Sequence, residues 1–321
     1  MRSYLCNKAH RPFSIDGDLT KAAWQAPPWT DDFLDIEGDI RPKPRFRTRA
    51  KMLWDDTNFY VGAYLDEPHV WGTLTEHDSV IFHDNDFELF LDPDGDNHLY
   101  AELEINALNT TWDLLMVKPY RDGGPPVSGW EIHGMRSAVR IDGTLNEAHD
   151  KDKGWSVEIA LPWKALSEIS GAQPCPPKVG DQMRINFSRV EWHTTIENGR
   201  YVKVPKTPED NWVWSPHGVI DMHRPELFGV VQFADGPADL RPYPGLAERD
   251  ALMRVYHAQR AYRDAHGHWA GHVSKLDLSV PGLEVFATPT DFEAVLGEWH
   301  VDAKSRLWRG EFAPAGRPTW D

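Results

Sequence analysis

The sequence is poor in cysteine, in basic residues and in long hydrophobic runs. Its 321 residues include only two cysteines, Cys6 and Cys175, which is too few for a disulfide framework and leaves open one bridge or two free thiols. The formal net charge of -16 argues against nucleic acid or an anionic membrane surface as a partner, because both would be repelled. No segment is apolar over the length needed to span a membrane.

Several chemical signatures are also missing. The sequence has no GxSxG, no P-loop and no dinucleotide-binding fingerprint, so nucleophilic and cofactor chemistry have no support. The first residues contain no apolar run of signal-peptide length, so we expect a cytoplasmic protein if the chain is complete and an exported one (periplasmic or extracellular) otherwise. A composition with 40% hydrophobic and 26% charged residues is nevertheless that of a globular protein with a large core.

Residues 83–113 contain two alternating strands joined by an acidic turn. Phe87, Leu89 and Leu91 share one face of the first strand, and Leu103 and Ile105 share one face of the second, since successive side chains of a strand point to opposite sides. We predict that these apolar faces belong to the core. The opposite face of the two strands is polar and strongly acidic, with Asp86, Glu88, Glu102, Glu104 and Asn106.

Short alternating segments continue on both sides of this pair and are separated by turns rich in proline and glycine. They cover residues 47–54, 58–66, 137–142, 154–163, 182–192 and 228–233, which favours an all-β fold: an antiparallel, jelly-roll-like β-sandwich over residues 1–233. Residues 246–264 carry apolar side chains at helical spacing, and β-like segments follow at 283–296 and 298–308. We therefore predict that residues 234–321 form a helix and a hairpin packed on the sandwich.

Seven motifs in order along residues 13–233 resemble the family 9 carbohydrate-binding module in its longer, family 9-like form. They are Ile15-Asp16-Gly17 with Ala23-Trp24, Trp54-Asp55-Asp56 with Phe59-Tyr60-Val61, Asp86-Phe87-Glu88-Leu89-Phe90-Leu91-Asp92-Pro93, residues 100–106, residues 154–163, Asn186-Phe187-Ser188-Arg189, and Trp214-Ser215-Pro216 with residues 225–229. The resemblance implies a β-sandwich that binds sugars by aromatic stacking and has calcium sites that shape its loops. Modules of this family are normally appended to an enzyme, whereas residues 234–321 are too few for a catalytic domain and lie outside the resemblance.

The acidic turn is a candidate calcium site. Asp92, Asp94 and Asp96 place oxygen ligands at alternating positions around Gly95, which permits a sharp turn, and a hard cation needs such an arrangement. The distal bidentate glutamate of an EF-hand loop is missing at the required spacing. An Asp-rich hairpin turn with local hydrogen bonds explains the same residues and is the alternative.

Tryptophans in loops and at strand ends are the candidate ligand contacts, because sugar rings pack their flat C–H faces on indole. Carboxylate, amide and guanidinium groups on one rigid surface suit hydrogen bonding to sugar hydroxyls. The alternative is that the rings fill loops and that the polar face is solvated. The predicted ligand-binding residues are Trp112, Trp192, Trp212, Trp214, Glu104, Asn106, Tyr120, Arg121, Asn186 and Arg189.

The predicted function is binding of a saccharide or polysaccharide by a β-sandwich, with calcium as the expected ion. The rival hypothesis is a glycoside hydrolase built on the same sandwich, which needs two carboxyl groups roughly 5–10 Å apart. A third hypothesis is a structural sandwich whose tryptophans cover a partner subunit or its own helix. The carboxylates that the hydrolase would use are two of Glu88, Glu102, Glu104, Glu191 and Asp113.

Overall fold

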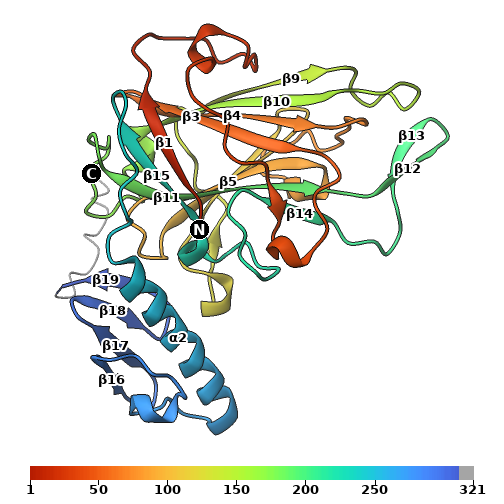
Figure 1. The fold of residues 1–321 in the computed structure, drawn as a ribbon. Coiled ribbons are helices and arrows are strands. Elements are labelled where there is room, and N and C mark those ends of the chain that lie inside the picture. Colours follow the sequence, from red (N-terminus) through yellow and green to blue (C-terminus); the bar gives the residue numbers. More distant parts are fainter. Residues whose placement is uncertain (311–321) are drawn as a thin grey trace.

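The computed structural model describes residues 1–310, and a curled sheet of thirteen strands forms most of it (Figure 1). Hydrogen-bonded neighbours follow the order β8-β7-β6-β5-β11-β15-β1-β3-β4-β10-β9, with β14 beside β11 and β2 beside β14. The strands are β1 (Ser3–Lys8), β2 (Leu34–Asp35), β3 (Thr48–Trp54), β4 (Asn58–Asp66), β5 (Asp86–Asp92), β6 (Tyr100–Asn106), β7 (Thr111–Met116), β8 (Pro126–Val127), β9 (Arg136–Asp142), β10 (Gly154–Pro162), β11 (Gln182–Glu191), β14 (Asp210–Val213) and β15 (Gly229–Ala234).

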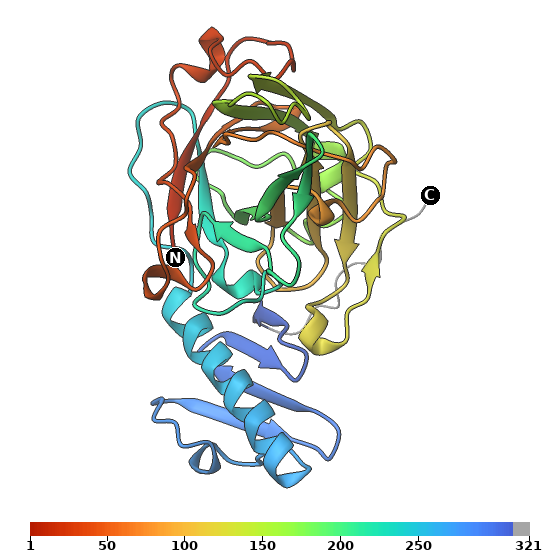
Figure 2. The same cartoon turned by 90° about the vertical axis from the view of Figure 1, so that its right-hand side faces the viewer.

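The sheet curls so that its two halves enclose one core, and Figure 2 shows the strands arranged around this interior. Phe87 and Leu89 of β5 belong to the same apolar cluster as Val61 of β4 and Ile159 of β10, which lie in the other half of the sheet. The predicted β-sandwich and the predicted apolar face of β5 and β6 are thus confirmed. One detail differs: β1 pairs in parallel with both β15 and β3, so the sheet is mixed.

Shorter elements connect the strands. A separate hairpin is formed by β12 (Thr194–Glu197) and β13 (Arg200–Lys203), and a short helix α1 (Trp163–Leu166) follows β10. Single 3₁₀ turns are η1 (Ala22–Trp24), η2 (Gly38–Ile40), η3 (Ile81–His83), η4 (Tyr120–Asp122), η5 (Pro225–Leu227) and η6 (Val273–Lys275). Cys6 and Cys175 are both free thiols. Within residues 1–310, no helix has the length and apolar character needed to cross a membrane.

The residues beyond β15 form a C-terminal unit, residues 246–310, with an apolar core of its own. Its helix α2 (Leu246–His266) ends at Gly267, whose φ of 78° suits glycine and whose N–H donates to the Arg263 carbonyl. The helix packs on a four-stranded sheet of β16 (Leu283–Ala287), β17 (Phe292–Leu296), β18 (Trp299–Asp302) and β19 (Leu307–Arg309).

The predicted helix and β-segments of the C-terminal extension are present, with two differences in detail. Each of the two β-like segments turns back on itself, so the extension has four strands and not one hairpin. The apolar side chains of α2, such as Leu252 and Val255, contact Ala294 and Val301 of this sheet and not the sandwich core. The spacing of apolar residues does predict the buried stripe of α2 but not what that stripe packs against.

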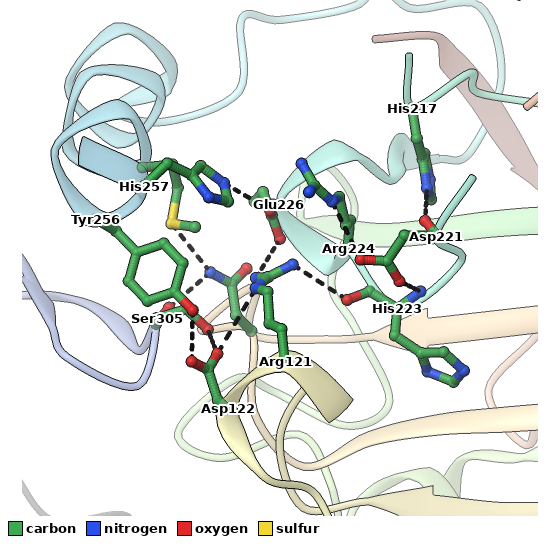
Figure 3. A network of polar contacts seen from close by, with 12 residues as sticks. Arg121, Asp122, His217, Asp221, His223, Arg224, Glu226, Tyr256, His257 and Ser305 are labelled. Atoms are coloured by element: carbon green, nitrogen blue, oxygen red, sulfur yellow. Dashed lines mark hydrogen bonds and ion pairs between the residues drawn. The ribbon is translucent and has the colours of Figure 1, made fainter. Parts of the chain in front are cut away.

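Polar contacts attach the C-terminal unit to the sandwich, and Figure 3 shows part of this junction. Asp122 of η4 accepts hydrogen bonds from Tyr256, from Ser305 Oγ at 2.6 Å and from Arg260 at 3.0 Å. The turn between β5 and β6 is the second attachment point, since Arg306 Nε lies 3.0 Å from Asp96 Oδ2. Charged side chains thus form part of this junction, and the carboxylates of Asp122 and Asp96 are largely withdrawn from solvent.

Replacing Asp122 by alanine is expected to loosen this junction. The change removes three hydrogen bonds to one buried carboxylate, and a hydrogen bond to a charged group contributes about 1.5–3 kcal/mol. Limited proteolysis of residues 235–245, which connect β15 to α2, should be at least about tenfold faster in the variant. The exposed Asp264 of the same helix supplies the control. Equal cleavage rates for Asp122→Ala and Asp264→Ala would show that Asp122 does not hold the unit.

Candidate functional site

Four carboxylates from β5 and β6 form a continuous acidic face on the side of the sheet away from the core. Asp86, Glu88, Glu102 and Glu104 alternate with the core residues of these strands, so they share one side. Glu88 lies directly opposite Glu104 in β6 and opposite Ser188 in β11. None of the four carboxylate residues is more than 5% exposed. The acidic face is thus not the solvated surface that polar alternation favours.

Segments distant in the sequence cover the acidic face. Phe90 and Tyr100, which lie on the same face of β5 and β6 as the carboxylates, belong to a second apolar cluster with Phe228, and Met222 packs at its margin. These two covering residues belong to the connection between β14 and β15. Near the other end of the face, the Phe82 N–H of η3 donates to Glu104 Oε2 at 2.8 Å.

The acidic face has few internal hydrogen bonds. The Val190 N–H donates to Asp86 Oδ1 at 3.1 Å. Asp86 Oδ2 and Glu88 Oε2 are buried and accept no hydrogen bond from any donor among residues 1–310, and the Ser188 side chain lies beside Glu88. Buried polar atoms without partners are rare in native proteins, because each costs about 1–3 kcal/mol of stability.

Burial raises the pKa of these carboxyl groups. The pKa of Glu88 rises to about 7 because burial disfavours its charged form. Burial, together with the negative charges of Glu88 and Asp86, raises the pKa of Glu104 well above its ordinary value. Burial and the charge of Glu88 act in the same way on Glu102. Near neutral pH the face must therefore retain protons or receive a positive charge.

Two half-buried tryptophans border the acidic face. Trp112 of β7 lies directly opposite Glu104 across the β6–β7 pair. Trp192 follows β11, and its Nε1 donates to the Phe82 carbonyl at 2.8 Å. Because Phe82 also contacts Glu104, both indoles lie next to the same end of the face.

Tyr120 lies at a third position on the border and is 50% exposed. Its ring centroid lies 4.4 Å from that of His223. The imidazole of His223 connects this ring to the acidic face, since its Nδ1 lies 3.0 Å from the Tyr100 hydroxyl and its Nε2 lies 4.0 Å from Glu102 Oε2. Burial lowers the pKa of His223 to about 4, so the imidazole is neutral at physiological pH. Three partly exposed aromatic rings, Trp112, Trp192 and Tyr120, thus border a buried acidic face.

A family comparison identifies the family of this sandwich. The sequence matches the family described as carbohydrate family 9 binding domain-like over residues 15–212. The chain belongs to this family. The matched segment contains the whole acidic face and the aromatic border, and it ends before β15 and the C-terminal unit. A search of curated proteins finds no match.

Solved structures are similar to this chain at low sequence identity. A candidate carbohydrate-binding protein from Bacteroides uniformis is 16% identical, with a TM-score of 0.53, and the match covers 72% of this chain and 99% of that one. A family 9 module from Caldicellulosiruptor kristjanssonii in complex with cellotriose is 16% identical over 76% of this chain and 100% of the module, with a TM-score of 0.47. The same type of module in complex with glucose is 15% identical over 75% of this chain and 100% of the module, with a TM-score of 0.48.

Two of the predicted ligand-binding tryptophans are core residues of this family 9-like sandwich. Trp212 is 3% exposed and Trp214 is 1% exposed. The Trp214 ring packs against Phe187 of β11 at a centroid distance of 5.8 Å. The prediction that these two indoles lie in an open loop is wrong, because β14 pairs with β11 and directs both rings into the core.

Four predicted polar contacts have protein partners. Asn186 Nδ2 donates to the Ser215 carbonyl at 3.0 Å, and Asn106 Nδ2 donates to Asp84 at 3.0 Å. Arg121, predicted as a rim group for ligand, donates to Glu226 at 2.9 Å. Arg189 is fully buried and forms ion pairs at 2.7 Å and 2.8 Å with Glu67 and Glu191. Asn106, Arg121, Asn186 and Arg189 therefore have partners within the protein, and ligand contact remains a prediction for these four residues as it does for Trp112, Trp192, Tyr120 and Glu104.

The five candidate catalytic carboxylates do not lie together. Glu88, Glu102 and Glu104 lie on the acidic face. Asp113 is opposite Leu103, on the core side of β7, and accepts a hydrogen bond from the Ile132 N–H at 2.5 Å. Glu191 lies on the opposite face of β11 from Ser188 and forms an ion pair with Arg189. Asp113 and Glu191 therefore cannot act with the other three on one bond.

The turn between β5 and β6 does bring the predicted calcium ligands together. Asp92, Asp94 and Asp96 each offer an oxygen, and these oxygens lie within 4.8 Å of one another. Two guanidinium groups of the C-terminal unit also contact this turn: Arg306 pairs with Asp96, and Arg249 donates to a turn carbonyl. Carboxylate oxygens suit calcium, but these arginines supply positive charge without it. Calcium at this turn remains a prediction.

Three residues near the acidic face have no clear signal in the sequence. Phe82 lies in a single 3₁₀ turn, and His223 lies in an irregular connection. Lys203 of β13 places its Nζ 3.5 Å from the centroid of the Trp192 ring. Phe82 and His223 come close to the face through contacts with residues farther away in the sequence, and Lys203 through the ring of Trp192, eleven residues earlier.

Proposed function

We propose that this chain binds a saccharide at the aromatic border of the acidic face, with Trp112, Trp192 and Tyr120 as the stacking residues. The observation that carries the proposal is the placement of three partly exposed rings around one rigid polar face. Membership of the carbohydrate family 9 binding domain-like family supports it. The position of the rings on or next to strands keeps their loss of conformational freedom on binding small.

The chemistry of the border suits a neutral sugar better than a charged one. Aromatic rings contribute apolar contact to the flat C–H faces of a pyranose, and carboxylates accept hydrogen bonds from its hydroxyl groups. An anionic sugar would also be repelled by the chain as a whole, whose formal net charge is -16. We therefore expect uncharged glycans among the ligands that the protein retains.

Glycoside cleavage is the second candidate function, because Glu88 and Glu104 lie opposite each other and the pKa of each is raised. A hydrolase needs room for a glycosidic bond between its two carboxyl groups. Glu88 is 4% exposed and Glu104 is 2% exposed, which favours binding over cleavage.

A glycan array, followed by product analysis of the retained oligosaccharides, tests the proposal. We expect retention without new reducing ends, and Trp192→Ala should weaken binding at least about tenfold, or about 1.4 kcal/mol. Trp29→Ala is the matched control, since Trp29 is also half-buried but contacts Arg49 of β3. Equal affinity of both variants would contradict the proposed site. New reducing ends that vanish in Glu104→Gln would replace binding with hydrolysis.

A further inference from the structure

The turn η4 places three consecutive side chains in three different surroundings. Tyr120 is 50% exposed at the aromatic border, where its ring lies 4.4 Å from that of His223. Arg121 donates to Glu226 of η5, and the carboxylate of Asp122 is fully buried. Because Tyr120 and Asp122 belong to one 3₁₀ turn, the contacts that hold the carboxylate also limit the movement of the exposed ring.

The C-terminal unit supplies every hydrogen bond to the Asp122 carboxylate within residues 1–310. Figure 3 shows Tyr256 of α2 and Ser305, which follows β18, directed at this carboxylate. Arg260 donates to it at 3.0 Å and donates to the Tyr256 hydroxyl at the same distance. Tyr256 and Arg260 are four residues apart and therefore lie on one face of the helix. The unit thus holds η4 with two segments that are distant from each other in the sequence.

The same helix also contacts η5. His257 of α2 places its Nε2 3.7 Å from Glu226 Oε1. Glu226 accepts a hydrogen bond from Arg121 of η4 at 2.9 Å, and Arg121 donates to the His223 carbonyl at 3.2 Å. Both η5 and His223 belong to the connection between β14 and β15. Helix α2 therefore contacts both segments whose rings meet at the aromatic border.

The backbone of η4 is held mainly within the turn itself. The N–H groups of Asp122, Gly123 and Gly124 donate to the carbonyls of Pro119 and Tyr120. The two glycines have φ values of 90° and 39°. Glycine loses more conformational freedom on ordering than any other residue. Without the contacts from the C-terminal unit, we therefore expect η4 and its exposed ring to sample several positions.

We propose that the C-terminal unit positions Tyr120 as one side of the saccharide-binding border, through its contacts with Asp122 and Glu226. Tyr256, Arg260 and Ser305 are then positioning residues that do not touch the ligand. The family match at residues 15–212 includes η4 but neither η5 nor the unit, so this support comes from outside the matched segment. The role of Tyr120 in binding rests on the proposed function, whereas the ordering of η4 by the unit does not.

Hydrogen exchange of the full chain, without saccharide, tests the ordering of η4. Tyr256→Phe keeps the ring but removes its hydrogen bond to Asp122, and Ser305→Ala removes another bond to the same carboxylate. In each variant, the amides of residues 120–124 should exchange at least about tenfold faster than in the unchanged protein, because a hydrogen bond to a charged group is lost. If one variant fails to fold, the other still decides.

Saccharide affinity tests whether this ordering reaches the ring. With a glycan that the array retains, Tyr256→Phe should weaken binding about threefold, because a mobile side chain must be immobilised on binding. The same change in a Tyr120→Ala background should have no further effect, since the ring that it positions is gone. A general loss of packing would weaken binding in both backgrounds, so the comparison separates positioning from a purely structural role.

Tyr262→Phe is the matched control, since Tyr262 lies in the same helix and stacks on His266 at a centroid distance of 4.0 Å. It should change neither the exchange rates nor the affinity. The proposal is overturned if Tyr256→Phe and Ser305→Ala exchange residues 120–124 as slowly as this control. It is also overturned if Tyr256→Phe leaves the affinity unchanged or lowers it equally with and without the Tyr120 ring. Retention of no glycan would contradict the proposed function instead, and the exchange rates would still decide whether the unit holds η4.

Discussion

Replacing Arg189 by methionine is expected to lower the free energy of unfolding by about 3–5 kcal/mol, because breaking a buried ion pair leaves charge without a partner. Arg189 is fully buried and donates to Glu67 at 2.7 Å and to Glu191 at 2.8 Å. It also donates to the Asp66 carbonyl at 2.9 Å and to Thr48 at 3.1 Å, so it connects β11 to the ends of β3 and β4. Denaturant unfolding of the two proteins measures the loss.

Arg140→Met is the matched control for this loss. Arg140 pairs with Asp18 at 2.7 Å, but its side chain is 58% exposed. An exposed pair of this kind contributes less than about 1 kcal/mol. If Arg189→Met costs no more than Arg140→Met, Arg189 does not hold the sandwich together. If the Arg189→Met variant is stable but does not bind saccharide, the prediction that Arg189 contacts the ligand is supported.

Without divalent cations, the protein is expected to be less stable at about pH 8 than at about pH 5.5. Burial raises the pKa of Glu88 from its ordinary value of 4.5 to about 7, so the folded chain binds this proton more tightly than the unfolded chain. The resulting stabilisation is complete below the unfolded pKa and is lost as the pH rises through the folded pKa. One pKa unit corresponds to about 1.4 kcal/mol, so the loss from Glu88 between pH 5.5 and pH 8 is on the order of 2 kcal/mol.

Thermal unfolding in EDTA across this pH range measures the effect. Burial also raises the pKa of Asp86, Glu102 and Glu104, so these groups act in the same direction as Glu88. Glu226 makes stability depend on pH in the opposite direction, but only at lower pH. Burial by itself would raise its pKa, but the hydrogen bond with His257 and the charge of Arg121 outweigh burial and lower the pKa to about 2. Glu88→Gln should make the profile between about pH 5.5 and 8 less steep, while Asp92 and Glu191, whose pKa values burial raises to about 7 and about 8, keep part of the slope. An unchanged protein that is equally stable or more stable at the higher pH would contradict the description of the acidic face.

Alternation of side chains predicts the strands and their core face well. Phe87, Leu89 and Leu91 lie in the sandwich core as expected. Every second side chain of a strand points to the same face, so the apolar face can be read from the strand's own sequence. The same pattern does not reveal that Glu88 and Glu104 are buried, since the covering residues Met222 and Phe228 come from a connection more than 100 residues later. Local patterning fixes the direction of a side chain and not what lies above it.

The errors at the candidate site have the same origin. Trp212 and Trp214 follow an irregular, proline-containing segment, which led to the prediction of an open loop. Residues 210–213 instead pair with β11 as a short core strand. In the sequence, Arg189 is a candidate ligand contact because its ion-pair partner cannot be recognised. That partner, Glu67, lies 122 residues away. By contrast, Asp92, Asp94 and Asp96 come together as predicted, because a turn brings near neighbours together without help from the rest of the fold.

A crystal structure with a saccharide from the array tests the central claim most directly. We predict density for a sugar ring against at least one of Trp112, Trp192 and Tyr120, at the border of the acidic face. A cavity of about 820 Å³ lies elsewhere on the sandwich and is lined by residues that include Lys8 and Phe13. A sugar bound only in that cavity, or anywhere away from the three rings, would contradict the proposed site.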